Sequence, residues 1–253
     1  MKKMLLIGIG AGNPEYMTVQ AINALNEVDV FFMMDKGRET EDLVRLRREI
    51  CERYIKDKSY RIVEATDPER DRTAPSYASA VEAWHEQRAL IYERMIEQEL
   101  GDDECGAFLI WGDPCLYDST LRIIERIAAK QTVGFDYQVI PGISSVQALA
   151  ARHKIALNRI GKSVHITTGR NIAHGLPDNV DDVVVMLDGD CSFKNVKDRE
   201  TDIYWGAYIG TKDEILVSGH LPNVMHDIER RRSEAKSQKG WIMDTYLLRK
   251  SGE

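Results

Sequence analysis

Residues 108–120 read FLIWGDPCLYDST, and this stretch decides the expected fold. The apolar run from Ala107 to Trp111 has the length of a buried strand, and it ends at Gly112-Asp113-Pro114. An apolar period typical of a helix then resumes at Leu121. The stretch therefore predicts a strand, a tight loop and a helix. In an open α/β sheet, ligands bind beside the loops that leave the carboxyl ends of such strands.

The residue types in this loop fit a binding site as well as an ordinary turn. Gly112 lets the backbone approach a ligand closely, and Pro114 stiffens the turn. Asp113 offers a carboxylate to a cationic or hydroxyl-bearing ligand. In the alternative interpretation, Asp113 only accepts hydrogen bonds from nearby backbone N–H groups. The loop alone does not distinguish these two interpretations.

Two further strands are followed by loops of similar character. The first strand is expected from Met4 to Gly12, and a loop over residues 11–17 leads from it to a helix with Thr18 as its N-cap. A strand at Tyr137–Ile140 ends in the loop Pro141–Ser145, whose serines can cap another helix. If the strands are parallel, all three loops open on one edge of the sheet and converge on one small-molecule crevice.

Several common motifs are absent. Gly8, Gly10 and Gly12 are spaced G-x-G-x-G, whereas a dinucleotide-binding loop reads G-x-G-x-x-G. Asp35, after the strand expected at residues 28–34, keeps a dinucleotide site open as a minor alternative. The lack of a Walker A loop argues against a triphosphate site. Neither H-E-x-x-H nor G-x-S-x-G occurs and the six histidines are dispersed, so nothing in the sequence requires a metal.

Composition narrows the class further. The chain has 253 residues, of which 43% are hydrophobic, enough for one large or two ordinary domains. A formal net charge of −7 gives no basic footprint for nucleic acid or an anionic membrane. The apolar runs are strand-sized, and the N-terminus lacks a signal-peptide pattern. The four cysteines lack metal-site spacing, and we expect a cytoplasmic, thiol-reduced protein.

We expect an α/β fold with two domains, an N-terminal domain at residues 1–153 and a C-terminal domain at residues 162–253. The boundary falls in a stretch that has few long apolar runs and ends at Gly161. Alternating strands and helices predict a mainly parallel sheet in the first domain. A hairpin between the strands expected at residues 203–209 and 214–217 predicts a mixed sheet in the second.

The second domain also contains a basic segment. A helix is expected at residues 221–232 and a closing strand at residues 241–248. Between them, Arg230–Lys239 is expected to be mobile, and Arg230-Arg231-Arg232 is interpreted as a solvated helix end.

Three motifs, taken in order, resemble the tetrapyrrole methylase family. They are the Gly-x-Gly-x-Gly-x-Pro run that ends at Pro14, the Gly-Asp-Pro run at residues 112–114, and Pro-Gly-Ile-Ser-Ser-Val at residues 141–146. With an apolar strand in the second half, the resemblance covers essentially the whole chain. The sequence departs from the family pattern at Trp111, where many relatives have Gly, and at Asn13, where they have Asp.

The resemblance implies an enzyme that transfers a methyl group from S-adenosylmethionine (SAM) to a carbon of a corrin precursor, leaving S-adenosylhomocysteine. It implies two α/β domains, usually in a homodimer, with SAM between the domains and a tetrapyrrole substrate that carries several carboxylates. An enzyme of the same family that acts at another ring carbon is one alternative. An RNA methyltransferase, against which the acidic charge argues, and a non-catalytic SAM-binding module are two others.

The resemblance also assigns residues to the SAM site. It places Pro14 beside the cofactor, Trp111, Gly112 and Asp113 at the methionine end, Leu116 near them, and Ser144 and Ser145 at the third loop. In the second domain, Met186 or Leu187 and Tyr208 or Ile209 would enclose the adenine.

Catalysis by such an enzyme needs positioning more than a reactive side chain. Methyl transfer in line to a ring carbon requires no covalent protein nucleophile. A step that moves a proton needs a base. The candidates are Asp113, Tyr117 and Asp118, and their spacing in the sequence does not favour one over the others. Basic residues after predicted strand ends could bind the carboxylates of the substrate, namely Lys36, Arg38, Arg70, Arg72 and Arg170.

Overall fold

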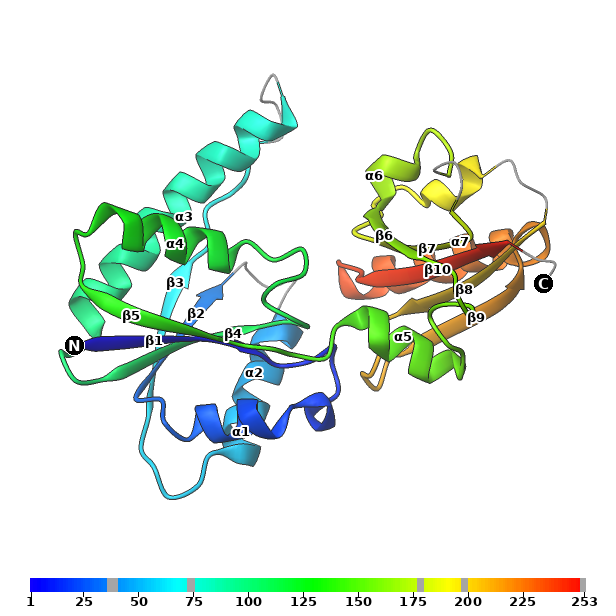
Figure 1. The fold of residues 1–253 in the computed structure, drawn as a ribbon. Helices are drawn as coiled ribbons and strands as arrows, with labels where there is room; N and C mark the ends of the chain where they lie inside the picture. Colours follow the sequence, from blue (N-terminus) through cyan, green and yellow to red (C-terminus); the bar gives the residue numbers. More distant parts are fainter. Residues whose placement is uncertain (36–40, 72–75, 177–179, 197–199, 251–253) are drawn as a thin grey trace. The chain divides into compact units, whose positions relative to one another are not determined.

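Figure 1 shows the protein as a computed structural model that describes residues 1–35, 41–71, 76–176, 180–196 and 200–250. Internal contacts divide the chain into two compact units. The first unit consists of Met1–Gly10 and Pro14–Ile143, and the second consists of Ala11–Asn13 and Ser144–Glu253. Each unit is built on its own five-stranded sheet.

The first unit alternates strands and helices along the chain (Figure 1). All of its strands run parallel, in the order β3-β2-β4-β1-β5, so the predicted parallel sheet is confirmed. Its elements are β1 (Lys2–Gly8), η1 (Pro14–Tyr16), α1 (Val19–Leu25), β2 (Val30–Asp35), α2 (Glu41–Tyr54), β3 (Arg61–Thr66), α3 (Tyr77–Glu99), β4 (Cys105–Ile110), α4 (Thr120–Lys130) and β5 (Phe135–Ile140).

Two layers of helices cover the first sheet. Every residue of β4 is buried, as expected for a parallel strand that is covered on both faces. Side chains of α1 and α2 join one core cluster, and side chains of α3 and α4 join the other. Thr18 caps α1 as predicted, because its hydroxyl oxygen accepts a hydrogen bond from Ala21 N at 3.0 Å. The neighbouring strands β2 and β4 are therefore followed by helices on opposite faces, which makes their carboxyl ends a topological switch point.

The second unit contains a mixed sheet with the order β6-β7-β10-β8-β9. Only β6 and β7 pair in parallel among these strands, and β8 and β9 form the predicted antiparallel hairpin. The side chains of Trp205 and Tyr246 are fully buried in its core. The elements are α5 (Ser145–His153), β6 (Val164–Thr168), α6 (Gly169–Ile172), β7 (Asp182–Met186), η3 (Ser192–Asn195), β8 (Thr201–Ala207), β9 (Ile215–His220), α7 (Leu221–Lys239) and β10 (Asp244–Lys250).

Helix α5 belongs to the second unit, whereas the sequence placed it at the end of a first domain of residues 1–153. The helix packs on the second sheet: His153 Nε2 lies 3.0 Å from Trp205 O, and Ser145 Oγ lies 3.0 Å from Thr245 Oγ1. A sequence pattern shows that such a helix is amphipathic but not which sheet covers its apolar face. The chain therefore passes from one unit to the other before α5.

The expectation of a mobile segment at Arg230–Lys239 is wrong, because α7 continues to Lys239. Arg230 forms ion pairs with Asp227 and Glu234 along the helix, at 2.6 and 3.1 Å. Arg232 is buried and pairs with Asp244 at 2.8 Å, so the three arginines are not a uniformly solvated helix end. The partner of Arg232 lies on β10, and the periodicity of a helix does not reveal contacts with another element.

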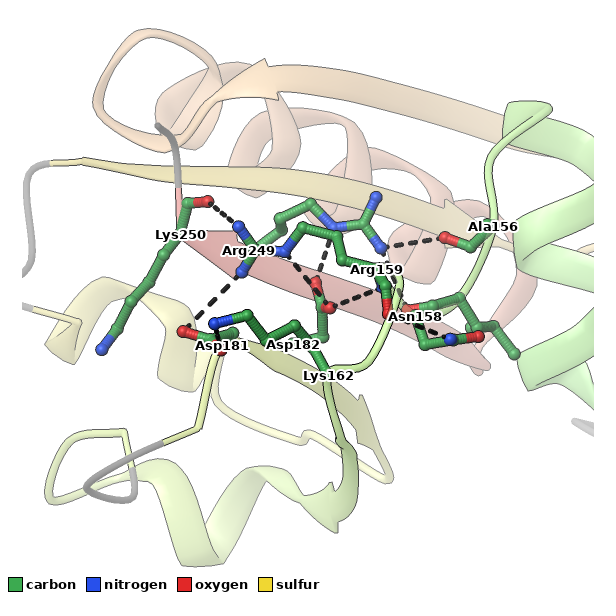
Figure 2. Close-up of polar contacts among 9 residues, drawn as sticks. Ala156, Asn158, Arg159, Lys162, Asp181, Asp182, Arg249 and Lys250 are labelled. Atoms are coloured by element: carbon green, nitrogen blue, oxygen red, sulfur yellow. Dashed lines mark hydrogen bonds and ion pairs between the residues drawn. The ribbon is translucent and has the colours of Figure 1, made fainter. Parts of the chain in front are cut away.

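A buried carboxylate fastens the segment before β6 to the second sheet (Figure 2). Asp182, at the start of β7, is fully buried, and its Oδ1 accepts a hydrogen bond from Arg249 Nε at 2.6 Å. Its Oδ2 lies 3.6 Å from Arg159 Nε. Arg249 Nη2 also donates to the carbonyl oxygens of Ala156 and Leu157, at 2.9 and 3.0 Å. This network holds residues 156–159 against β7 and β10.

Replacing Asp182 by alanine is expected to lower the unfolding free energy by about 3 kcal/mol, because Arg249 and Arg159 would remain largely buried without their carboxylate. Urea denaturation followed by circular dichroism measures this loss. Asp181→Ala is the matched control: its carboxylate is one-third exposed, lies 3.5 to 3.8 Å from its basic partners and should contribute less than about 1 kcal/mol. Equal stability of the two variants would contradict the assignment.

Candidate active site

The loops after β1 and β4 are joined by a pair of backbone hydrogen bonds. Gly112 N donates to Gly10 O at 2.9 Å, and Gly10 N donates to Gly112 O at 3.3 Å. The sequence predicted that the loops of parallel strands would meet at one edge, and this contact confirms it for the first two. Because the bridge lies just beyond the strands, it fixes both loops at the carboxyl edge of the sheet.

The loop after β5 packs directly against the other two. An ideal Cβ atom on Gly142 would lie 2.1 Å from Gly112 O and 2.9 Å from Gly8 Cα. No real side chain tolerates such distances, so only glycine fits at position 142. The third loop thus also lies at the predicted edge. The sequence identified each glycine-bearing loop. It did not indicate that the backbones of the three loops pack directly against one another.

The carboxylate of Asp113 ties the second loop to the third. Its Oδ1 accepts a hydrogen bond from Cys115 N within its own loop, and its Oδ2 accepts one from Gly142 N, each at 2.8 Å. The alternative of an aspartate that satisfies backbone N–H groups is therefore realised, and one of those groups lies on a different loop. Hydrogen bonds to an ionised carboxylate are about twice as strong as neutral ones. We name the contacts among Gly8, Gly10, Gly112, Asp113 and Gly142 the glycine rim.

Beyond the glycine rim, the first loop carries backbone groups without partners. Ala11 and Gly12 are buried, and no hydrogen bond among the described residues involves the N–H or C=O of either. Buried backbone groups are almost always paired, so binding of a ligand by these groups is a prediction. The polar donors and acceptors of an amino-acid moiety fit such groups. Pro14 follows in η1, and its carbonyl oxygen accepts from the Tyr54 hydroxyl at 3.0 Å.

The other side chains of the second loop differ in burial and in hydrogen bonding. Trp111 and Leu116 are half-buried, and Tyr117 is exposed with a positive φ of 52°. Asp118 Oδ1 accepts from Thr120 N at 2.6 Å, and no hydrogen bond to its Oδ2 is found among the described residues. The exposed Cys115 is a poor nucleophile, because desolvation and the nearby Asp113 raise the pKa of its thiol.

The remaining residues that the resemblance assigns to the cofactor lie in the second unit. Ser144 caps α5 by accepting from Val146 N at 3.1 Å, and Ser145 is held by Thr245. Met186 ends β7, and Leu187 follows with a positive φ of 52° and a side chain that is 65% exposed. An exposed leucine in the left-handed region is unusual and indicates a constrained loop. The positions of these residues around a cofactor stay a prediction.

A buried network holds the loop that carries Leu187. The Asp188 carboxylate accepts hydrogen bonds from Ser192 N at 2.6 Å and from the Tyr246 hydroxyl at 2.6 Å. Burial and the Asp188 charge raise the pKa of Tyr246, which keeps its hydroxyl protonated as a donor. At the other assigned position, Tyr208 is buried and its hydroxyl donates to Trp241 O at 2.5 Å, while Ile209 is 5% exposed.

Of the five basic residues proposed for substrate carboxylates, the structure describes two, one in each unit. Arg70 is exposed and lies over the ring of Tyr77, with 5.1 Å from its guanidinium carbon to the ring centroid. Arg170 is exposed on α6 in the second unit. The other three candidates, Lys36, Arg38 and Arg72, lie outside the described residues.

The described residues provide neither a metal site nor a membrane-spanning helix. They contain no group of three or more His, Cys, Asp or Glu side chains arranged to hold a metal ion. Among them, no helix combines the length and apolar character that crossing a membrane demands.

A parallel sheet whose loops lock together at its carboxyl edge is typical of small-molecule-binding α/β proteins. The chain belongs to the tetrapyrrole (corrin/porphyrin) methylases, which it matches over residues 3–224.

Three relatives illustrate the range of similarity. The chain is 53% identical to precorrin-6A synthase [deacetylating] of Sinorhizobium sp, over 100% of this chain and 97% of the relative. It is 38% identical to the crystal structure of a cobalamin synthesis related protein (CobF) from Corynebacterium diphtheriae, with a TM-score of 0.85 and full coverage of both chains. Uroporphyrin-III C-methyltransferase from Thermus thermophilus, solved in complex with S-adenosylhomocysteine, shares the fold at 17% identity and a TM-score of 0.57, over 97% of this chain and 91% of that one.

Proposed function

We propose that this protein is a SAM-dependent C-methyltransferase of cobalamin biosynthesis, which methylates precorrin-5 at C1 with loss of acetate to give precorrin-6A. The observation that carries the proposal is the 53% identity to a precorrin-6A synthase [deacetylating] over the whole chain. The glycine rim supports it, because the three motifs that form the rim are those by which the sequence resembles the family.

The residues of the rim act by positioning. Asp113 and the backbone bridge between Gly10 and Gly112 fix the loops before any ligand arrives, so binding does not have to order them. The unpaired backbone groups of Ala11 and Gly12 would bind polar groups of the cofactor. When bound, SAM supplies an electrophilic methyl group on a sulfonium. Holding that methyl group in line with a ring carbon can contribute up to about 7–11 kcal/mol of barrier lowering.

Loss of the acetyl group requires a second kind of chemistry. Water attacks the acetyl carbonyl while a base takes its proton. The bond between the carbonyl carbon and the macrocycle then breaks, its electron pair stays on the macrocycle, and acetate leaves with the oxygen of the water. Both carboxylate oxygens of Asp113 already accept backbone hydrogen bonds, which makes Asp113 the weaker candidate. Asp118 uses one oxygen for Thr120 N and has the other available. We therefore favour Asp118 over Asp113 as the base, with Tyr117 as the third candidate.

Incubation with precorrin-5 and methyl-labelled SAM tests the function. We expect labelled precorrin-6A and one equivalent of acetate for each methyl group transferred. A labelled product without acetate would indicate a corrin methyltransferase that acts at another ring carbon. Saturable binding of SAM and S-adenosylhomocysteine in calorimetry without turnover would indicate a non-catalytic SAM-binding module.

The proposal includes a homodimer and a cytoplasmic location, and it includes no nucleic-acid or membrane partner. The net charge of −7 supports the exclusion of RNA. Light scattering on the purified protein tests the dimer, and a monomer at assay concentration would remove that part of the proposal.

A further inference from the structure

Arg47 places a guanidinium at the carboxyl end of β4. The side chain projects from α2 and is half-buried. Its Nε donates to Leu109 O at 2.9 Å, and its Nη1 donates to Leu43 O at 3.0 Å. Among the described residues, no hydrogen-bond partner of Nη2 is found. Two carbonyl oxygens therefore fix the direction of the guanidinium and leave one of its edges available.

The hydrogen bond to Leu109 replaces one that the sheet would otherwise make. Alternate carbonyl groups of a strand point to the same side, and Cys105 O accepts from Asp29 N on the β2 side, so Leu109 O also faces β2. The register between β2 and β4 nevertheless ends at the pair Phe32 and Phe108. Arg47 thus occupies the point where the two strands separate, and this point is the topological switch point at which α/β sheets bind ligands.

The charge of Arg47 lacks a counterion among the residues that the structure describes. No carboxylate among the described residues lies within ion-pair distance of it, although Asp118 is near enough to favour its charged form. Desolvation lowers the pKa of Arg47, but a guanidinium remains protonated in proteins. Arg88, whose charge also acts on Arg47, is buried but pairs with Asp67 at 2.8 Å. A desolvated cation without a counterion is unfavourable, and an arriving anion would reduce that penalty.

We propose that Arg47 binds a side-chain carboxylate of the tetrapyrrole substrate, an inference that rests on the proposed function. A fixed guanidinium with a free edge is the group that best matches a planar carboxylate. The loop that follows β4 carries Asp118 together with Gly112 and Asp113 of the glycine rim. A macrocycle anchored at Arg47 would therefore lie beside the loop assigned to the cofactor and the candidate base. Arg47 would then set which way round the macrocycle enters.

Arg47→Gln tests the inference in the full-length enzyme. We expect the KM for precorrin-5 to rise about 10- to 100-fold, the loss typical of a charged hydrogen-bonding partner, with kcat within about threefold of wild type. Arg47→Lys keeps the charge but loses the paired N–H donors of the guanidinium. Its KM should fall between those of the wild type and Arg47→Gln. Arg48→Gln is the matched control, since Arg48 is exposed on the same helix and paired with Glu64, and its KM should not change.

Calorimetry with SAM shows whether Arg47 binds a carboxylate of the substrate or the carboxylate of SAM. SAM affinity within about twofold of wild type in Arg47→Gln supports the inference and shows that the variant is folded. An unchanged KM in a variant that turns over, or a loss of SAM affinity with no change in KM, would overturn it. Failure of the wild-type protein to convert precorrin-5 would instead refute the proposed function.

Discussion

Gly142→Ala is expected to abolish measurable SAM binding and to lower the unfolding free energy by about 3 kcal/mol. The new methyl group would lie 2.1 Å from Gly112 O and 2.9 Å from Gly8 Cα, and both neighbours are backbone atoms that cannot rotate away. The third loop would have to leave the rim, which breaks the hydrogen bond from Gly142 N to Asp113. Calorimetry with SAM and urea denaturation measure the two effects.

Gly134→Ala is the control for this prediction. Gly134 lies just before the same strand, β5, and a Cβ atom there would have no neighbour within 4 Å. Its SAM affinity and stability should match those of the wild type. Wild-type SAM affinity in Gly142→Ala would show that close packing of the three loops is not needed for cofactor binding.

Asp113→Ala is expected to weaken SAM binding more than about tenfold while the protein stays folded. The substitution leaves Cys115 N and Gly142 N without their acceptor, at a cost of about 1–3 kcal/mol for each group that water does not reach. The sheet and both helix layers do not depend on this carboxylate, so cooperative unfolding should remain. Calorimetry and circular dichroism check the two parts of the prediction separately.

A second pair of variants isolates the role of the Asp113 charge. Asp113→Asn retains one acceptor oxygen and should lose less affinity than Asp113→Ala. Asp136→Ala removes an exposed carboxylate that accepts from Tyr137 N, its neighbour in β5, and should leave SAM affinity unchanged. Equal SAM affinity in wild type and Asp113→Ala would show that the family-based assignment of Asp113 to the site is wrong.

Local patterns sufficed to predict most strands and helices of the first unit. The apolar run predicted as a strand is β4, which is buried at every residue. Thr18 caps α1 through a hydrogen bond to a residue three positions away, so the sequence around it was enough to predict the cap. Parallel topology then determined that the loops would share an edge. These predictions succeeded because each depends on neighbours in sequence or on a rule about strand direction.

Features that depend on contacts between distant residues were not predictable in the same way. The sheet on which α5 packs, and the partner that keeps Arg232 buried, lie on elements far away in sequence. Nothing in the sequence singled out Arg47, because its significance arises from the separation of β2 and β4. The fit of Gly142 against Gly8 and Gly112 likewise requires three loops at once. The sequence identified the loops, and only the structure shows how they are joined.

The central claim is that the loops after β1, β4 and β5 form one locked rim that binds the methyl donor. A crystal structure of the protein with S-adenosylhomocysteine tests this claim most directly. We predict that the methionine end of the ligand contacts the backbone of residues 111–113 and the unpaired backbone groups of Ala11 and Gly12, with the hydrogen bond between Asp113 and Gly142 intact. A ligand bound only away from these loops, or loops that separate when it binds, would contradict the account.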